Sequence, residues 1–452
     1  MTTSGLASGS RRTALVAALA AGLLTACGGG GSDLPPPPLS CSVADQQTWL
    51  RGYMNDWYFW YASHPNPSPA GYSTVDSYFQ ALKYTGNVAP FPADRWSYVS
   101  STASFNRFYG DGKTLGYGAM VAGLEVVGHP ELPLYIRYIE PGSPAAVAGL
   151  LRGDQILTIN GATAASVIAA NDFSALSPTA EGQLLSLGVA GFTQPVSLTS
   201  AVYALEPVTN AKVLTTAGGR KVGYLSVKDM VNQALTPVDN AFASFKQQGV
   251  QDVVIDLRYN GGGLVSAAAS IASYPNSAAA GQTYANLLYN DRKAGNNQTF
   301  RFNNYFNSAL GLSRVYVLTG QRTCSASEQL INGLRPFVTV VTVGDTTCGK
   351  PVGFLPQDDG CGNTYSVVNF ESVNTNNEGR YFDGFNATCA VADDTAWPLG
   401  NSGEPLLATA LAHADTGSCP VLSSRAKPQA WRPAIQRPRV VEPGDRGGMV
   451  LR

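Results

Sequence analysis

The sequence predicts three folded regions after residue 40: a small helical domain, a β-rich domain, and a larger α/β domain with a parallel sheet. Three observations predict them. Aromatic residues recur with helical spacing between residues 43 and 82, short apolar segments separated by tight turns fill 116–161, and the order strand, helix, strand occurs twice between 222 and 343. Strands joined through a helix lie parallel, with a right-handed crossover, so this repetition indicates an α/β fold.

The first 26 residues are predicted to be a signal peptide. Arg11 and Arg12 precede an apolar segment over 14–24, and the motif LTAC at 24–27 has the order of a bacterial lipoprotein signal, with Cys27 as the lipidated residue. The apolar segment is shorter than the roughly 20 residues of a membrane span. Residues 27–40 are rich in glycine and then in proline, which is typical of a tether. We therefore expect a lipid-anchored protein of the cell envelope that faces the periplasm or the exterior.

The helical domain is assigned to residues 41–112. Trp49, Tyr53, Trp57 and Trp60 recur on one face of a helix, and a second helix is expected after Ser73 or Thr74. These aromatic side chains either line a peptide groove or form a plain helical core, and their spacing favours the core.

The β-rich domain is assigned to residues 113–208, with strands expected over 120–127, 134–139 and 155–160. The segment EPGSPAAVAGLLRGDQILTING, which starts at Glu140, resembles a PDZ domain. PDZ domains add an extended peptide as a strand and hold its terminal carboxylate on backbone N–H groups. The resemblance implies that the loop formed by Gly116, Tyr117, Gly118 and Ala119 holds a peptide carboxylate.

The α/β domain is assigned to residues 209–419. Its first strand, helix, strand unit covers 222–257 and runs into the glycine-rich turn Asn260-Gly261-Gly262-Gly263. Backbone N–H groups of such a turn hold either an oxyanion or a phosphate. The phosphate alternative, a phosphate-binding α/β enzyme, lacks both the GxxxxGK[ST] and the GxGxxG motif.

The second unit contains a serine and a lysine at its two ends. Strands are expected over 315–318 and 338–343 and a helix over 326–334, with Ser325 at the helix start and Lys350 25 positions later. Parallel strands of one sheet end on the same edge, so a lysine there could accept the serine's proton if burial lowers its pKa. The alternative is that Ser325 only caps the helix and that Lys350 is a surface cation.

The motifs DLRYNGGG at 256–263, SASE at 325–328 and GDTTCGK at 344–350 resemble the carboxy-terminal processing (tail-specific) serine proteases. The resemblance implies a serine endopeptidase that cleaves proteins near their carboxy termini and needs no cofactor. It implies that Ser325 is the nucleophile, that Lys350 is the general base, and that the N–H groups of Gly262 and Ala326 form the oxyanion hole. Glu328, Thr347 and Gly261 match supporting positions.

One residue departs from the family pattern. The family often has Gln four residues after the lysine, where this chain has Phe354, so what orients Lys350 stays open and Gln357 is a candidate. The departure leaves an alternative function, a catalytically inactive peptide-binding envelope lipoprotein that retains the protease fold.

Six cysteines remain after Cys27, an even number that suits an oxidising compartment. Cys324 and Cys348 each lie within two residues of a candidate catalytic group and are therefore a candidate disulfide. No metal site is expected, because the three histidines are scattered and no CxxC motif occurs.

The net charge is −1, of which the signal peptide carries +2 and residues 420–452 carry +5, which leaves −8 for residues 27–419. An acidic body argues against nucleic-acid binding. The expected partners are therefore protein or peptide substrates with exposed carboxy termini, and the membrane through Cys27. Residues 420–452 are basic and rich in proline and are expected to be disordered.

Overall fold

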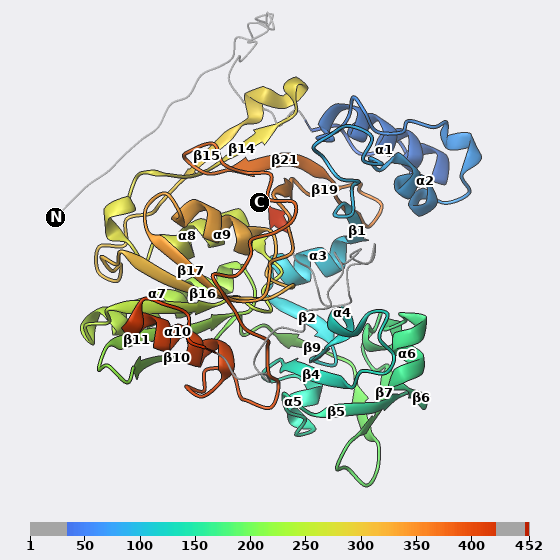
Figure 1. The fold of residues 1–452 in the computed structure, drawn as a ribbon. Helices are drawn as coiled ribbons and strands as arrows, with labels where there is room; N and C mark the ends of the chain where they lie inside the picture. Colours follow the sequence, from blue (N-terminus) through green and yellow to red (C-terminus); the bar gives the residue numbers. More distant parts are fainter. Residues whose placement is uncertain (1–33, 422–447, 452) are drawn as a thin grey trace, which may run out of the picture. The chain divides into compact units, whose positions relative to one another are not determined.

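The computed structural model describes residues 34–421 and 448–451 (Figure 1). The predicted signal peptide, the lipidation site Cys27 and most of the tether lie outside these residues, as does the stretch 422–447 of the basic tail. Within the described part of the chain, no helix is both long and apolar enough to cross a membrane.

The N-terminal region is helical, as predicted. Its elements are α1 (Val43–Trp57), η1 (Pro69–Gly71), α2 (Val75–Leu82), β1 (Tyr98–Ser101) and α3 (Thr102–Tyr109). The three α-helices begin after the capping residues Ser42, Thr74 and Ser101. The side-chain oxygen of each capping residue accepts a hydrogen bond from the backbone N–H three residues later. The aromatic face of α1 is buried, with Tyr53 fully covered, so these side chains form a core.

The β-rich region has the PDZ-like architecture that the sequence predicts. It contains a sheet in the order β3-β4-β5-β7-β8, in which β6 pairs with β5, and a separate pair of β2 with β9. Its elements are β2 (Lys113–Gly116), β3 (Ala119–Val121), α4 (Gly123–Val126), β4 (Leu134–Ile139), α5 (Pro144–Val147), β5 (Gln155–Ile159), β6 (Ala162–Thr163), α6 (Ala164–Ala170), η2 (Ser174–Leu176), β7 (Leu184–Val189), β8 (Val196–Thr199) and β9 (Ala201–Ala204).

One predicted strand of this region is wrong. The segment 120–127 leaves the sheet after Val121 and turns into the short helix α4. The turn directs Glu125 toward Arg137 and Arg322, to which its carboxylate pairs at 3.1 and 3.2 Å. In the sequence, the apolar residues on both sides of Glu125 favour a strand. In the structure, the chain turns at this point, and the two ion pairs of Glu125 accompany the turn.

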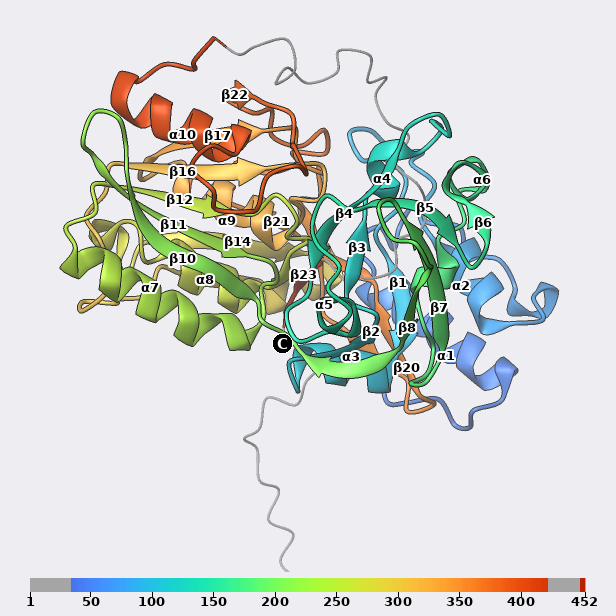
Figure 2. The same cartoon turned by 90° about the horizontal axis from the view of Figure 1, so that it is seen from below.

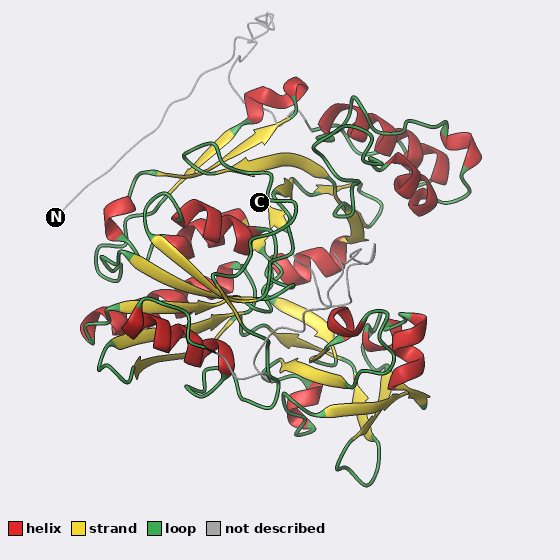
Figure 3. Cartoon of the chain, in the orientation of Figure 1, coloured by secondary structure: helices red, strands yellow, loops and turns green. Residues whose placement is uncertain are grey.

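The C-terminal region contains the predicted parallel sheet, in the order β10-β11-β12-β16-β17-β22. All neighbours from β11 to β22 are parallel, and β10 is antiparallel to β11. Figures 1 and 3 show α8 and α9 on one side of these strands and α10 on the other. The elements from β10 to α9 are β10 (Val208–Thr215), β11 (Lys221–Val227), η3 (Asn232–Ala234), α7 (Leu235–Gln247), β12 (Asp252–Asp256), β13 (Gly263–Leu264), α8 (Val265–Ala272), η4 (Ser277–Ala279), β14 (Thr283–Tyr289), η5 (Asp291–Asn296), β15 (Gln298–Arg301), β16 (Arg314–Thr319) and α9 (Ala326–Leu334).

Two further sheets contain strands of this region, in the orders β13-β23-β18-β21-β14-β15 and β1-β20-β19, and the second includes β1 of the N-terminal region. The remaining elements are β17 (Thr339–Gly344), β18 (Val352–Phe354), β19 (Gln357–Asp358), β20 (Asn363–Ser366), β21 (Val368–Val373), β22 (Cys389–Ala390), α10 (Pro405–Thr416) and β23 (Met449–Val450). Strand β23, labelled in Figure 2, differs from the expectation for the tail, because it pairs with β13 and β18 of the α/β region.

Three disulfides link the described cysteines: Cys41–Cys361, Cys324–Cys348 and Cys389–Cys419. The predicted bridge between Cys324 and Cys348 is therefore confirmed, with the two Cα atoms 5.0 Å apart. Two of these disulfides lie beside a further possible metal ligand: Cys389–Cys419 beside His413, and Cys324–Cys348 beside Glu328. Because the cysteines are disulfide-bonded, neither cluster offers thiolate ligands to a metal ion.

Candidate active site

Ser325 lies in a tight turn between β16 and α9. Its backbone has φ +58° and ψ −111°, a conformation that residues with a Cβ rarely adopt and that clusters at functional sites. The side chain is buried, and its Oγ has no hydrogen-bond partner among the described residues. A buried hydroxyl without a partner at the start of a helix is available to react with a ligand.

Lys350 is buried as well, with 3 % of its surface exposed. Burial lowers its pKa to about 7, because the charged ammonium loses its hydration there, and Asp94 and Glu328 oppose this only in part. Its Nζ lies 3.9 Å from the centre of the Phe354 ring. Phe354 thus occupies the space next to the amine, while Gln357 lies in β19, where its amide donates to the carbonyl of Asp358.

Glu328 joins the serine turn to the lysine loop. One carboxylate oxygen, Oε2, accepts from the backbone N–H groups of both Ser325 and Lys350, at 2.9 and 2.8 Å. The other, Oε1, accepts from the Gly349 N–H at 2.6 Å and the Thr347 hydroxyl at 2.5 Å. The structure therefore brings Ser325 and Lys350 to one shared acceptor, and the adjacent Cys324–Cys348 bridge ties the same two segments covalently.

The glycine-rich turn lies against this pair. A Cβ built on Gly262, where φ is +109°, would come within 3.1 Å of the Ser325 Cβ and 3.0 Å of the Ala326 nitrogen, so only glycine fits there. The N–H of Ala326 belongs to the first turn of α9, where N–H groups lack an intrahelical acceptor. The N–H of Gly262 donates to Asn260 Oδ1 at 2.8 Å, so that side chain holds it in this conformation.

The predicted carboxylate loop of the PDZ-like region lies apart from this pair. Residues 116–119 line a cavity of about 1050 Å³ together with residues of α3 and with Lys228, whereas neither Ser325 nor Lys350 lines it. The carbonyls of Tyr117 and Gly118 accept from the N–H groups of Ala145 and Glu140, which fixes the loop against the start of α5.

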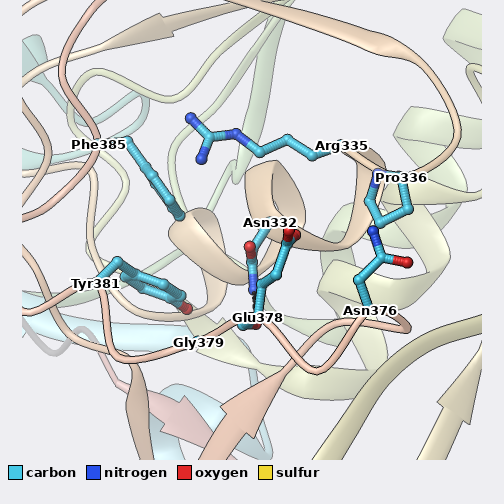
Figure 4. A pocket seen from close by; sticks show the side chains of 8 residues that line it. All are labelled: Asn332, Arg335, Pro336, Asn376, Glu378, Gly379, Tyr381 and Phe385. Carbon is cyan, nitrogen blue, oxygen red and sulfur yellow. Dashed lines mark hydrogen bonds between the residues drawn. The ribbon is translucent and has the colours of Figure 1, made fainter.

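A second cavity, of about 400 Å³, lies at the C-terminal end of α9 (Figure 4). No predicted site residue lines it. Its lining consists of Asn332, Arg335, Pro336, Asn376, Glu378, Gly379, Tyr381 and Phe385.

Charged residues for which the sequence predicts no role connect the PDZ-like region to the α/β region. Arg322, three residues before Ser325, pairs with Glu125 at 3.2 Å. Farther along, Asp393 pairs with Arg152 at 2.7 Å and with Arg258 at 3.0 Å, and these guanidinium groups hold its pKa far below the usual range. Arg258 stands within the motif at 256–263 and Asp393 within an acidic pair, but Arg152 and Arg258 both lie far from Asp393 in the sequence.

Family models match three consecutive parts of the chain. They describe a peptidase S41 N-terminal domain over residues 45–98, a PDZ domain over 135–187 and peptidase family S41 over 221–378. The chain belongs to peptidase family S41. The glycine-rich turn and both Ser325 and Lys350 lie inside the matched family segment.

Relatives and solved structures agree with this membership. The S41 chain is 29 % and 30 % identical to carboxyl-terminal-processing proteases of Picosynechococcus and Synechocystis, over 55 % of its own length and 59 % and 58 % of theirs. A crystal structure of an S41 protease from Bacteroides fragilis matches 82 % of the chain and 97 % of its own, with 26 % identity and a TM-score of 0.65. The photosystem II D1 C-terminal processing protease matches at 18 % identity and a TM-score of 0.51, which supports the fold.

Proposed function

We propose that this S41 protein is a serine endopeptidase that cleaves protein substrates near their carboxy termini with a Ser325/Lys350 dyad. The observation that carries the proposal is a buried lysine, with a pKa of about 7, whose backbone shares the Glu328 acceptor with Ser325. A lysine is a general base only when its amine is neutral, and this one loses its proton near neutral pH.

In the proposed reaction the neutral Nζ of Lys350 takes the hydroxyl proton of Ser325 as Oγ attacks the substrate carbonyl carbon. The oxyanion is held by the N–H groups of Ala326 and Gly262, the latter exchanging Asn260 Oδ1 for the substrate oxygen. The C–N bond then breaks, the ammonium gives its proton to the leaving amine, and water activated by Lys350 hydrolyses the acyl-enzyme.

Glu328, Thr347 and the Cys324–Cys348 bridge position the two groups in this proposal. The PDZ-like loop at 116–119 would hold the free carboxylate of a substrate, and Cys27 would carry a lipid that keeps the protein in the cell envelope. The proposed partners are therefore protein chains with loose carboxy termini.

The test is cleavage of an unfolded reporter protein by the chain from Cys41 onward. Activity should be present in the unmodified protein and lost by a factor of about 10³ or more in Ser325→Ala and in Lys350→Ala. Ser166→Ala and Lys221→Ala, which change exposed residues of α6 and β11, serve as matched controls and should keep full activity. Peptide binding without cleavage and without labelling of Ser325 by a fluorophosphonate probe would instead indicate the inactive, peptide-binding alternative.

A further inference from the structure

The segment 448–451 contains β23, which lies as an added strand between β13 and β18. It runs parallel to both: Met449 stands opposite Gly263 and Gly353, and Val450 stands opposite Leu264 and Phe354. The Gly263 N–H donates to the Gly448 carbonyl at 2.7 Å, and the Leu451 N–H donates to the Phe354 carbonyl at 2.9 Å. Backbone hydrogen bonds along both edges are how a groove binds an extended peptide.

The start of this segment passes directly beside the candidate dyad. A Cβ built on Gly448 would lie 3.3 Å from Lys350 Nζ. The residue that donates to the Gly448 carbonyl, Gly263, follows Gly262, which contacts the Ser325 turn. From Gly448 the segment runs along β18 away from Lys350, so residues 449–451 extend from the dyad as a peptide would.

The groove has selective positions for this segment. The same Cβ on Gly448 would come within 2.6 Å of the Phe354 ring, so the ring excludes any residue larger than glycine unless it moves. Because Gly353 has no side chain, there is room for Met449: a Cβ on Gly353 would lie 2.8 Å from the Met449 Cβ. Met449 and Val450 are both fully buried.

We propose that the groove between β13 and β18 is a peptide-binding subsite next to the dyad. It takes an extended peptide with glycine beside Phe354 and two buried apolar residues after it, and the chain's own segment 448–451 is its resident occupant. The segment therefore competes with substrate peptides for the groove. The proposal rests on the proposed function only where it identifies the competing ligand as a substrate. Occupancy of the groove by segment 448–451 is measured by peptide binding.

The test measures binding of the labelled hexapeptide Gly-Gly-Met-Val-Leu-Arg, which copies residues 447–452, to the full chain carrying Ser325→Ala. Because the nucleophile is absent, the result does not depend on cleavage. Adding Gly448→Val to this chain should expel its own segment against the Phe354 ring and tighten peptide binding at least tenfold. The valine-containing hexapeptide, Gly-Val-Met-Val-Leu-Arg, should bind at least tenfold more weakly to the same protein.

Phe354→Ala provides the specificity control. With the ring removed, the valine hexapeptide should bind about as well as the glycine hexapeptide. Equal binding of the two peptides while Phe354 is present would overturn the proposed selection for glycine. Equal binding of the glycine peptide to chains with and without Gly448→Val would overturn the proposed competition.

A measurement on the unmodified sequence guards against misfolding of the variants. A large excess of the glycine hexapeptide should speed hydrogen exchange at the Leu451 amide several-fold, because the peptide replaces the segment in the groove. The amide of Leu287 in β14, in the same sheet but away from the groove, is the internal reference and should not change. No acceleration at Leu451 at a saturating peptide concentration would overturn the proposal and make β23 a permanent strand.

Discussion

Substitution of Glu328 by Gln tests whether this carboxylate holds the site together. Each carboxylate oxygen accepts two hydrogen bonds, from Ser325 and Lys350 on one side and from Gly349 and Thr347 on the other. In either orientation of the amide, an NH₂ group would face two donors. Two hydrogen bonds to a buried acceptor are then lost, at about 1.5–3 kcal/mol each. Burial disfavours the charge of Glu328 and raises its pKa, and Gln does not carry this cost, so the free energy of unfolding should fall by less than the full sum of about 3–6 kcal/mol.

The assay is urea unfolding of both proteins, together with cleavage of the unfolded reporter. We expect activity to fall by about 10² or more, because displacing the serine turn from the lysine loop by about 1 Å costs that much. Glu131→Gln is the control: this glutamate is exposed and pairs with His129 at the surface, so its substitution should leave unfolding and cleavage nearly unchanged. If the Glu328→Gln protein has the same free energy of unfolding in urea and the same rate of reporter cleavage as that control, the reasoning is refuted.

Four further predictions follow, two on the lysine, one on the disulfide and one on the PDZ-like loop. Activity should rise with pH through about 7, where the neutral amine of Lys350 forms, and should persist with chelators; a profile flat from pH 6 to 8 would contradict this. The folded-state pKa lies below the unfolded one, so burial of the ammonium destabilises the fold fully below pH 7 and progressively less up to about 10.5. Lys350→Met should therefore raise the free energy of unfolding at pH 7 by several kcal/mol and by less at pH 10, and an equal gain at both would contradict the pKa shift. The double variant Cys324→Ala/Cys348→Ala should lose about 3 kcal/mol of stability and part of its activity, and unchanged melting would show that the bridge adds nothing. A peptide substrate with an amidated terminus should have a higher KM than its free acid, whereas equal values would remove the proposed role of residues 116–119.

The helix and the two strands around Ser325 could be predicted from the sequence because their signals are local. The predicted helix 326–334 has the observed bounds of α9, and the predicted strands differ from β16 and β17 by about one residue at each end. β-branched segments and helical periodicity act within a few residues, and the chain order gives the parallel pairing.

The parts that the sequence could not predict depend on contacts between distant residues. The packing of separate segments determines which four groups donate hydrogen bonds to Glu328. It also determines that Glu125 pairs with Arg322. The pairing of Cys41 with Cys361 was one choice among 15 pairings of six cysteines. Strand β23 escaped prediction because Met449 and Val450 form only a short apolar segment at the end of a basic, proline-rich tail.

The Cys41–Cys361 bridge determines how the protein responds to a mechanical load on its N-terminal end. It joins two residues 320 positions apart in the chain. Tension applied before residue 41 passes through the sulfur atoms directly to Cys361, next to β20, because the covalent shortcut is far shorter than the intervening chain. The three N-terminal helices and the PDZ-like region are thereby excluded from the loaded path. A pull that would otherwise peel the chain apart from α1 onward is borne by a covalent bond, and those parts keep their fold under load.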